Sequence, residues 1–184
     1  MTVASTYDFL SGPSWEVAPL LLGWVLETRL EDAITAVELT EVEAYDQTDP
    51  ASHSFRGETV RTAAMFGPPG HLYVYRSYGI HWCVNIVTGP SGHGAAVLLR
   101  GGRPLAGIGK MIERRGRSDH LADGPGKLAQ ALGLTDADYG RDLTAGDTVR
   151  LRPGRRPKAS LAGPRVGITR ATDAPWRFIA VHPE

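Results

Sequence analysis

The sequence has almost no cysteine and no long apolar run. Cys83 is the one cysteine among 184 residues, which excludes a disulfide framework and a cysteine-based metal site. Its neighbours Trp82 and Val84 are apolar, so we expect a buried, unreactive thiol in a reducing compartment. No stretch of about 18 apolar residues occurs that would cross a membrane. Residues 1–12 also lack the basic start and apolar stretch of a secretory signal, so we expect a protein that is not secreted.

A net charge is lacking as well. The formal net charge is zero, which by itself argues against a nucleic-acid partner. The charges are unevenly placed, however: residues 1–99 hold 4 Lys and Arg against 11 Asp and Glu, and residues 100–184 hold 16 against 9. This asymmetry indicates either a basic binding face within a neutral total, or arginines within 114–117 and 152–156 that only solvate a helix end and a loop. Charge alone does not separate the two interpretations.

Segments typical of strands dominate the chain and follow one another directly. Alternating, β-branched residues predict a strand over 34–45, and residues 71–88 predict two strands that meet at Tyr78–Gly79. Further strands are expected at 95–100, 147–154, 165–169 and 176–183, and helical segments at 16–28 (cut by Gly23), 59–66, 104–116 and 124–134. Strands that follow strands, with helices between the groups, indicate an antiparallel α+β fold. No linker divides the chain, so we expect residues 1–184 to form one domain.

Ionisable side chains gather where the strand over 34–45 ends. Alternation places Val37, Leu39, Glu41, Glu43 and Tyr45 on one face of that strand. One interpretation is that the strand simply leaves the core and the glutamates are solvated, which is the commoner case. The other is that a carboxylate lies in a partly apolar cleft, where desolvation raises its pKa towards the range of a general base. Glu43 is the better candidate because Tyr45 could shape a pocket beside it.

The histidines do not indicate a metal site. His53 follows Glu43 by ten residues in a polar loop, and the other histidines stand singly. Neither HExxH nor a similar close spacing is present. We therefore expect no metal and no other cofactor, and a lone loop histidine such as His53 is most often a polar surface residue.

Tyrosines concentrate in the predicted hairpin. Tyr73 and Tyr75 share one face of its first strand, which most often means packing within a sheet. Tyr78 falls at the turn, where burial is difficult, and large aromatic residues at exposed tips serve as wedges or stacking platforms. Asn85 interrupts the apolar returning strand and must hydrogen-bond either to backbone or to a ligand. Arg100 ends the next strand, as a contact to an anion or phosphate would.

Several longer motifs resemble one family. The stretches "EVEAY", "MFGPPGHLYVYRSYGIHWCVNIV", "GAAVLLRGGRPLAG" and "GPGKLAQALGL" are similar to those of the alkyladenine (3-methyladenine) DNA glycosylase family. The likeness runs from about residue 16 to residue 178, and the combination is far more specific than any one motif. The resemblance implies an α+β domain with a curved, mostly antiparallel sheet, short flanking helices and a protruding β-hairpin. It also implies monofunctional excision of alkylated or deaminated purines (3-methyladenine, hypoxanthine or ethenoadenine) from duplex DNA, which leaves an abasic site.

The matching motifs carry the family's catalytic and base-binding roles to single residues. Glu43 would be the general base that activates water, and Arg100 would help to hold that water and a phosphate. Tyr45 and Tyr75 would stack the base after it is flipped out of the duplex. His53 would lie against the other edge of the base or against the sugar-phosphate.

The same resemblance implies contacts to the rest of the DNA. Asn85 would form the floor of the pocket and disfavour a guanine amino group. Tyr78 would fill the gap left in the duplex. Arg61, Ile80 and Lys127 would contact the DNA backbone. Glu41 and the aspartates Asp46 and Asp49 would then be surface residues. The chain has three lysines and none in the strand-end cluster, so Schiff-base chemistry and strand cleavage are not expected.

Two segments depart from the family pattern. The loop over 58–66 lacks the proline that is usual before the arginine and carries Ala63 where the family often has Arg or Thr, so a phosphate contact is expected to be missing. The sequence ends at "RFIAVHPE", where the family usually continues into a tail that supplies a backbone carbonyl to the water. We therefore expect one anchor fewer for that water, with an effect on activity or substrate range.

Three functions stay open at this point. The first is base excision; the second is an inactive relative that only binds damaged or kinked DNA. The third is a small-molecule nucleoside hydrolase, which would not need Tyr78. For the first we expect a monomer that acts on double-stranded DNA with a damaged base, away from membranes, in a bacterial nucleoid or a nucleus. The preferred lesion does not follow from the sequence.

Overall fold

Antiparallel strands and short helices make up the described part of the chain. The computed structural model describes residues 5–181. The strands are β1 (Val25–Leu30), β2 (Ala33–Tyr45), β3 (Leu72–Ser77), β4 (His81–Val87), β5 (Ala96–Ala106), β6 (Val149–Arg152), β7 (Ala159–Gly163) and β8 (Arg177–Val181). The helices are α1 (Ser14–Leu21), α2 (Ile108–Arg115) and α3 (Pro125–Leu132), with 3-10 turns η1 (Asp8–Ser11), η2 (Ala63–Phe66) and η3 (Asp136–Asp138). Within the described range, no helix is long and apolar enough to cross a membrane.

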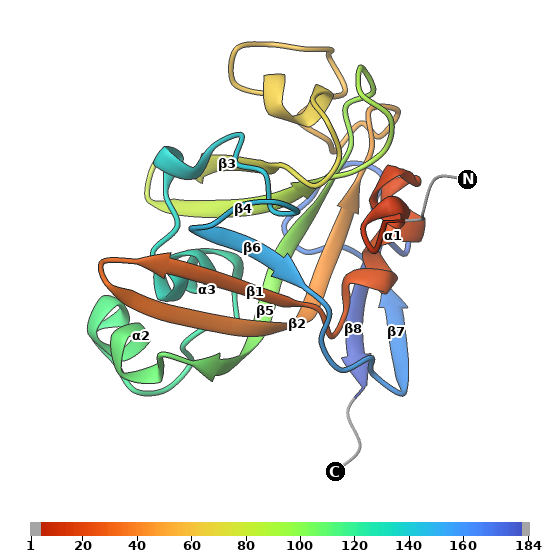
Figure 1. Ribbon diagram of the computed structural model, residues 1–184. Helices are drawn as coiled ribbons and strands as arrows, with labels where there is room; N and C mark the ends of the chain where they lie inside the picture. Colours follow the sequence, from red (N-terminus) through yellow and green to blue (C-terminus); the bar gives the residue numbers. More distant parts are fainter. Residues whose placement is uncertain (1–4, 182–184) are drawn as a thin grey trace.

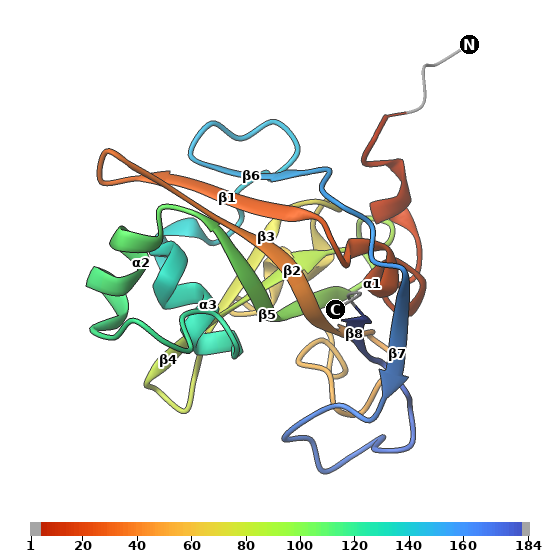
Figure 2. The ribbon, with the colours of Figure 1, turned by 90° about the horizontal axis from the view of Figure 1, so that it is seen from below.

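The long strand β2 organises the sheet. The hydrogen-bonded order is β3–β4–β5–β2–β1–β6, and the neighbouring strands are antiparallel. On one edge β2 pairs with β5; on the other it pairs first with β1 and then, near its end, with β8, which in turn pairs with β7. The sheet is strongly curled, and the β3–β4 hairpin forms one of its edges (Figures 1 and 2). The expected α+β fold with a curved antiparallel sheet is confirmed.

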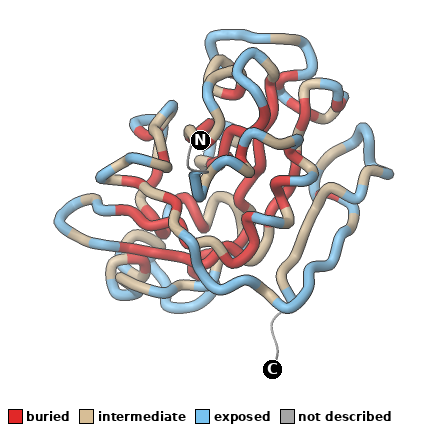
Figure 3. The backbone as a smooth tube through the Cα atoms, turned by 45° about the vertical axis from the view of Figure 1, so that its right-hand side comes forward, coloured by how far each residue is buried: buried red, intermediate tan, exposed pale blue. Residues whose placement is uncertain are grey.

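The main core lies between one face of the sheet and the helices. Val84 of β4 and Val97 of β5 pack with Leu21 of α1 and Leu128 of α3, and all four side chains are fully buried. Burying one such leucine stabilises the fold by about 2 kcal/mol. Buried segments therefore run through the middle of the molecule while the connecting loops are exposed (Figure 3). Because side chains alternate along a strand, the residues between these core positions face the other side of the sheet.

A β-bulge changes which residues of β2 share a face. Leu39 and Glu41 pair with adjacent residues of β5, so Thr40 has no partner, and the register shifts again before Val42. A one-residue slip turns the following side chains over. Leu39 and Val42 both lie in the main core, so the expectation that Leu39 shares a face with Glu41 and Glu43 is wrong. The bulge is what directs Glu43 away from the core.

Other element predictions are confirmed in part. The strand ending at Tyr45, the hairpin, and the helix of residues 124–134 are confirmed. The helix predicted over 104–116 begins only at Ile108, after Gly107 with its positive φ of 70°, because β5 runs on to Ala106. Residues 165–169 form an irregular segment rather than the predicted strand. The strand β7 was not predicted, since its residues are small and mostly exposed.

The acidic first half and the basic second half of the chain bond to each other. Glu27 of β1 contacts Arg150 and Arg152 of β6, and Glu38 of β2 contacts Arg103 of β5. Further pairs of the same kind are Glu31–Lys110, Glu31–Arg114, Glu41–Arg100, Glu41–Arg177 and Asp49–Arg165. Many of the unevenly placed charges thus pair with one another between neighbouring elements. Neither interpretation of the sequence included such internal ion pairs.

Candidate active site

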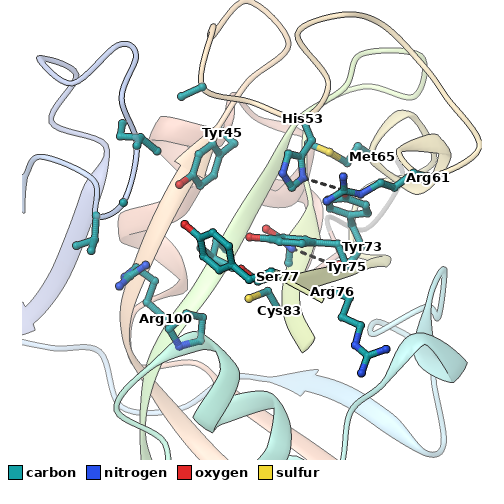
Figure 4. A pocket seen from close by; sticks show the side chains of 18 residues that line it. Tyr45, His53, Arg61, Met65, Tyr73, Tyr75, Arg76, Ser77, Cys83 and Arg100 are labelled. Atoms are coloured by element: carbon teal, nitrogen blue, oxygen red, sulfur yellow. Dashed lines mark hydrogen bonds between the residues drawn. The ribbon is translucent and has the colours of Figure 1, made fainter. Parts of the chain in front are cut away.

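A cavity of ≈ 480 Å³ lies on the sheet face opposite the main core. Side chains from four strands and from the loops around them line it. Seven of the ten residues predicted for the site are among these lining residues: Tyr45, His53, Arg61, Tyr75, Tyr78, Asn85 and Arg100. Figure 4 shows Tyr45, His53, Tyr75 and Arg100 gathered around this space. The other three predicted residues, Glu43, Ile80 and Lys127, do not line it.

Cross-strand pairing aligns the floor of the cavity with Glu43. Tyr73 of β3 pairs with Asn85 of β4, Asn85 with Leu98 of β5, and Leu98 with Glu43 of β2. Residues directly opposite one another in antiparallel strands project from the same face. Tyr73, Asn85 and Leu98 line the cavity, so the row places Glu43 at the end of its floor.

The carboxylate of Glu43 is completely buried, with 0% of the residue exposed. The Val166 N–H donates to its Oε1 at 2.8 Å, and the Tyr45 hydroxyl donates to its Oε2 at 2.8 Å. The Arg100 Nε lies 3.4 Å from Oε1. Tyr45, Arg100 and Val166 all line the cavity, so the carboxylate lies immediately behind the cavity wall. Each carboxylate oxygen can accept two hydrogen bonds, which leaves acceptor capacity on both.

Glu41 is partly exposed, but its carboxylate is held in ion pairs rather than solvated as predicted. Its Oε1 accepts from the Arg100 Nε at 3.0 Å and from the Arg177 Nε at 2.6 Å. Arg100 is therefore shared between Glu41 and Glu43, two residues apart on β2. These charge-assisted contacts hold the Arg100 guanidinium at the cavity wall rather than extended into water.

Asp46 and Asp49 are buried, so their prediction as surface residues is wrong. Burial works against ionisation of Asp46, but hydrogen bonds from His93 and Thr48 outweigh it and lower its pKa. Asp49 makes a very short contact with the buried side chain of Arg165. Both carboxylates stabilise the loop that leads from β2 to His53.

His53 packs among tyrosines at the cavity edge. Its Nδ1 lies 2.9 Å from the Tyr73 hydroxyl, and its ring meets the Tyr75 ring edge-on, with 4.6 Å between centroids. Desolvation of the ring, together with the positive charge of Arg61, lowers the pKa of His53 to about 4. His53 is therefore a neutral imidazole at pH 7, although part of the residue remains exposed.

The tyrosines of the cavity are neutral hydrogen-bond donors. Burial, followed by the charge of Glu43, raises the pKa of Tyr45 well above its ordinary value. Burial also raises the pKa of Tyr75, and it raises that of Tyr73 to about 12. The Tyr73 and Tyr75 rings stack at 5.7 Å between centroids. They thus form one aromatic wall, with Tyr45 on the neighbouring side of the space (Figure 4).

Asn85 is buried in the cavity floor, and its Nδ2 donates to the Tyr73 carbonyl at 3.0 Å. The sequence left open whether this residue binds backbone or a ligand. The backbone contact is present, and the residue also borders the cavity, so both can hold at once.

The hairpin tip presents a large aromatic side chain to solvent. Tyr78 is 90% exposed, and its φ of 50° lies in the left-handed region, as does that of Gly79 at 69°. The Ile80 N–H donates to the Ser77 carbonyl at 3.0 Å, as in a type I′ turn. A left-handed conformation costs a residue other than glycine about 1–2 kcal/mol. Ile80, beside Tyr78, is also mostly exposed.

Arg61 and Lys127 have different surroundings. The Arg61 guanidinium lies 5.6 Å from the centroid of the Tyr75 ring and borders the cavity, a cation–π arrangement. The Lys127 Nζ contacts Asp123 at 2.9 Å across one turn at the start of α3. Arg61 thus lines the cavity, whereas Lys127 does not, although Pro125, two residues before it, does.

Two residues of the site were missed from the sequence. Val166 supplies a backbone N–H to Glu43, and Arg165 lies beneath Tyr45 with 4.6 Å from its guanidinium carbon to the ring centroid. Both come from the irregular segment that was predicted as a strand. The flanking Pro164 and Gly167 were the available signal, because they are typical of a turn rather than a strand.

The side chains present suit hydrolysis. The cavity borders a buried carboxylate, neutral phenols and a guanidinium, and none of its lining residues in the described chain is a lysine. Among residues 5–181, no group of three or more His, Cys, Asp and Glu side chains is placed to hold a metal ion. A carboxylate of this kind can act as a general base towards water.

Comparison with known proteins first gives the class. The family model described as "Methylpurine-DNA glycosylase (MPG)" matches residues 8–183. The chain belongs to the methylpurine-DNA glycosylase family, whose members are DNA glycosylases of base excision repair. The resemblance seen in the sequence motifs is confirmed.

Individual relatives agree with this assignment. A protein of Rhodopseudomonas palustris (strain ATCC BAA-98 / CGA009) is 52% identical over 165 residues, which cover 89% of this chain and 78% of the relative. One of Nitrosospira multiformis is 48% identical over 173 residues (93% and 86%), and one of Cutibacterium acnes is 47% identical over 179 residues (92% and 92%). Each of the three is named "Putative 3-methyladenine DNA glycosylase".

Proposed function

We propose that this chain hydrolyses the N-glycosidic bond of alkylated or deaminated purines in duplex DNA and leaves an abasic site. The position of Glu43 carries the proposal. Its buried carboxylate lies directly behind the wall of an aromatic cavity, at the end of the row that begins with Tyr73 and Asn85. Family membership supports the reaction class.

In this mechanism Glu43 accepts a proton from a water molecule at the cavity wall. The water oxygen forms a bond to C1′ of the deoxyribose while the bond from C1′ to the purine nitrogen breaks. The electron pair of the broken bond leaves with the base, and the proton held by Glu43 passes on to solvent or to the released base. General-base catalysis of this kind contributes about 10²–10⁴-fold.

Water must first reach the covered carboxylate. Three groups form the cover: the Tyr45 hydroxyl, the Val166 N–H and the Arg100 guanidinium. Of these three groups only the Tyr45 hydroxyl contacts Oε2, so that oxygen can accept a second hydrogen bond, and a small displacement of the wall would let water donate it. Arg100 then lies where it can donate both to the water and to a phosphate of the sugar.

The cavity suits an electron-poor purine. The faces of Tyr45 and Tyr75 attract a cationic alkylated base, as the Arg61 guanidinium near Tyr75 illustrates. His53 is neutral at pH 7 and adds no positive charge of its own. A base with a positive charge is also the better leaving group, so a permissive pocket can still select it.

The reacting carbon is out of reach while the base is stacked, so the nucleotide must rotate out of the duplex. Exposed Tyr78 at the hairpin tip is placed on the rim of the same cavity. Inserted into the duplex, its ring replaces the lost stacking and offsets an unstacking cost of about a few kcal/mol. Ile80 beside it would contact the adjacent nucleotides.

Glu43→Gln tests the mechanism. The amide keeps the size of the side chain and removes the base, so release of hypoxanthine or 3-methyladenine from duplex DNA should stop while binding of the lesion duplex persists. Glu27→Gln is the matched control, because Glu27 is also a buried carboxylate held by arginines but does not line the cavity, so this variant should retain release. Undiminished release by Glu43→Gln would overturn the mechanism.

One observation favours a second candidate, a module that binds damaged DNA without excision. Glu43 has no exposed surface, and a carboxylate that never meets water cannot act as a base. The wild-type chain separates the two functions. Free base released from a lesion duplex, measured by chromatography, supports excision; tight binding with no release over hours supports the binding module.

A further inference from the structure

Arg165 is a buried arginine next to the site. Its side chain is 0% exposed, whereas arginine is almost never fully buried unless it is paired. It belongs to the irregular segment between β7 and β8, which also contributes Val166, Gly167 and Ile168 to the cavity lining.

The Arg165 guanidinium binds three parts of the chain at once. Its Nη1 donates to the Ala44 carbonyl of β2 at 2.9 Å and makes the very short contact with Asp49 in the loop after β2. Its Nη2 donates to the Ala171 carbonyl of its own segment at 3.4 Å. The guanidinium also lies between two rings, 4.6 Å from the Tyr45 centroid and 5.2 Å from that of Trp176.

These contacts hold in place the two groups that donate hydrogen bonds to Glu43, the Val166 N–H and the Tyr45 hydroxyl. The Val166 N–H that bonds Oε1 belongs to the peptide group that joins Val166 to Arg165, and a peptide group is planar and rigid. The Tyr45 hydroxyl that bonds Oε2 is carried by the ring on which Arg165 stacks. Arg165 therefore contacts the carriers of two hydrogen bonds that orient the carboxylate.

Stability alone is a weak reason for this arrangement. A buried ion pair is often no more stabilising than apolar side chains of the same volume. The buried Nε of Arg165 also has no hydrogen-bond partner among the described residues, which costs free energy. The contacts are best explained by what they orient.

We propose that Arg165 is a positioning residue that sets the orientation of the Glu43 carboxylate through the Val166 N–H and the Tyr45 hydroxyl. The proposal rests on the proposed function of Glu43 as general base. Arg165 itself touches neither the substrate nor the reacting atoms. Its loss should slow the chemical step and leave DNA binding unchanged.

Arg165→Lys is the first test. Lysine keeps the positive charge beside Asp49 but has one nitrogen and no planar face, so it cannot bind both carbonyls and stack between the rings. The single-turnover rate of base release should fall about 100-fold, as a small misplacement of a catalytic group does. The Kd for a lesion duplex, measured in the Glu43→Gln background to prevent turnover, should not change.

A second variant guards against misfolding. Arg165→Met combined with Asp49→Asn removes both charges together and leaves no unpaired ion in the interior. It should show the same loss of rate even if its Tm equals that of the wild type. Glu27→Gln is the matched control: Glu27 is a buried carboxylate held by Arg150 and Arg152 away from the cavity, and its loss should lower Tm without slowing release.

The outcomes separate the two proposals. Wild-type rates in both Arg165 variants, with Glu43→Gln inactive, would leave the general base in place and overturn the role of Arg165. Equal losses of rate and of DNA affinity would overturn it too, because they indicate a collapsed site. Full release by Glu43→Gln would refute the proposed function itself, whatever the Arg165 variants do.

Discussion

Tyr45 donates a hydrogen bond to Glu43, with 2.8 Å from its hydroxyl oxygen to Oε2. The two residues are two positions apart on β2, so their side chains leave the same face of the strand. The residue proposed to stack the base thus also binds the proposed catalytic carboxylate.

Substitutions at Tyr45 can separate these two contacts. Tyr45→Phe keeps the ring but deprives a buried carboxylate of a donor, so the free energy of unfolding should fall by about 1–3 kcal/mol, with unchanged affinity for a lesion duplex. Tyr45→Ala also removes the ring and should weaken that affinity by about 1–3 kcal/mol. Urea unfolding and fluorescence anisotropy measure the two quantities. Equal losses of affinity in both variants would show that the hydroxyl, not the ring, contacts the DNA.

The placement of the site was predictable wherever one strand carried the signal. Glu43 and Tyr45 at a strand end, Tyr75 on the hairpin and Tyr78 at its turn are all local patterns, and the structure has them at those places. Which side chains of β2 face the core was not predictable, because the bulge at Thr40 arises from the pairing of β2 with β5. Nothing in the sequence of β2 marks that slip.

Contacts between distant segments were out of reach for a physical reason. Val166 and Glu43 are far apart in the sequence, and a backbone N–H leaves no trace in residue type. The burial of Asp46 and Asp49 depends likewise on partners from other elements, His93 and Arg165. The same holds for the ion pairs of Glu41 with Arg100 and Arg177. The excess of arginine and lysine in the second half suggested a binding face, yet many of these side chains form ion pairs within the protein.

The low pKa of His53 predicts an acid-sensitive fold. The pKa is about 4 in the folded chain against an ordinary value of 6.5, so between these values the unfolded chain binds a proton at His53 and the folded chain does not. The free energy of unfolding should therefore fall as the pH drops from 6.5 to 4. His53→Gln should remove this part of the slope. Chemical denaturation at several pH values measures it, and parallel curves for the two proteins would contradict the prediction.

Arg61 offers a check on the cause. Burial is the larger contribution to the lowered pKa of His53 and the positive charge of Arg61 the smaller. Arg61→Met should raise the pKa of His53 but leave it below 6.5. An NMR titration of the imidazole reports this directly, and an unchanged value would exclude a charge effect from Arg61.

Asn85 should limit which purines the cavity accepts. Asn85→Ala removes the amide from the floor and should raise release of guanine-type lesions relative to hypoxanthine, while the Tyr73 carbonyl loses its donor at a cost of about 1 kcal/mol. Leu98→Ala is the control, because Leu98 pairs with Asn85 across the strands and also lines the cavity. The ratio of kcat/KM for the two lesions measures selectivity. An equal change in both variants would assign the discrimination to volume rather than to the amide.

Tyr78 at the hairpin tip should lower the stability of the fold and raise the activity on duplex DNA. Asparagine adopts the left-handed conformation of Tyr78 with little strain and favours a type I′ turn before glycine, so Tyr78→Asn should raise the free energy of unfolding by about 1 kcal/mol. Without the ring, release from a paired lesion in duplex DNA should fall steeply, and release from the same lesion in single-stranded DNA should fall little. Ile80→Ser is the control, because it makes the tip polar without relieving the strain at Tyr78.

A nucleoside hydrolase would turn over free nucleosides at an undiminished rate in Tyr78→Asn and would show no preference for duplex DNA. A loss confined to the duplex substrate would instead tie the strained tyrosine to base flipping, because only the duplex has a stack to fill.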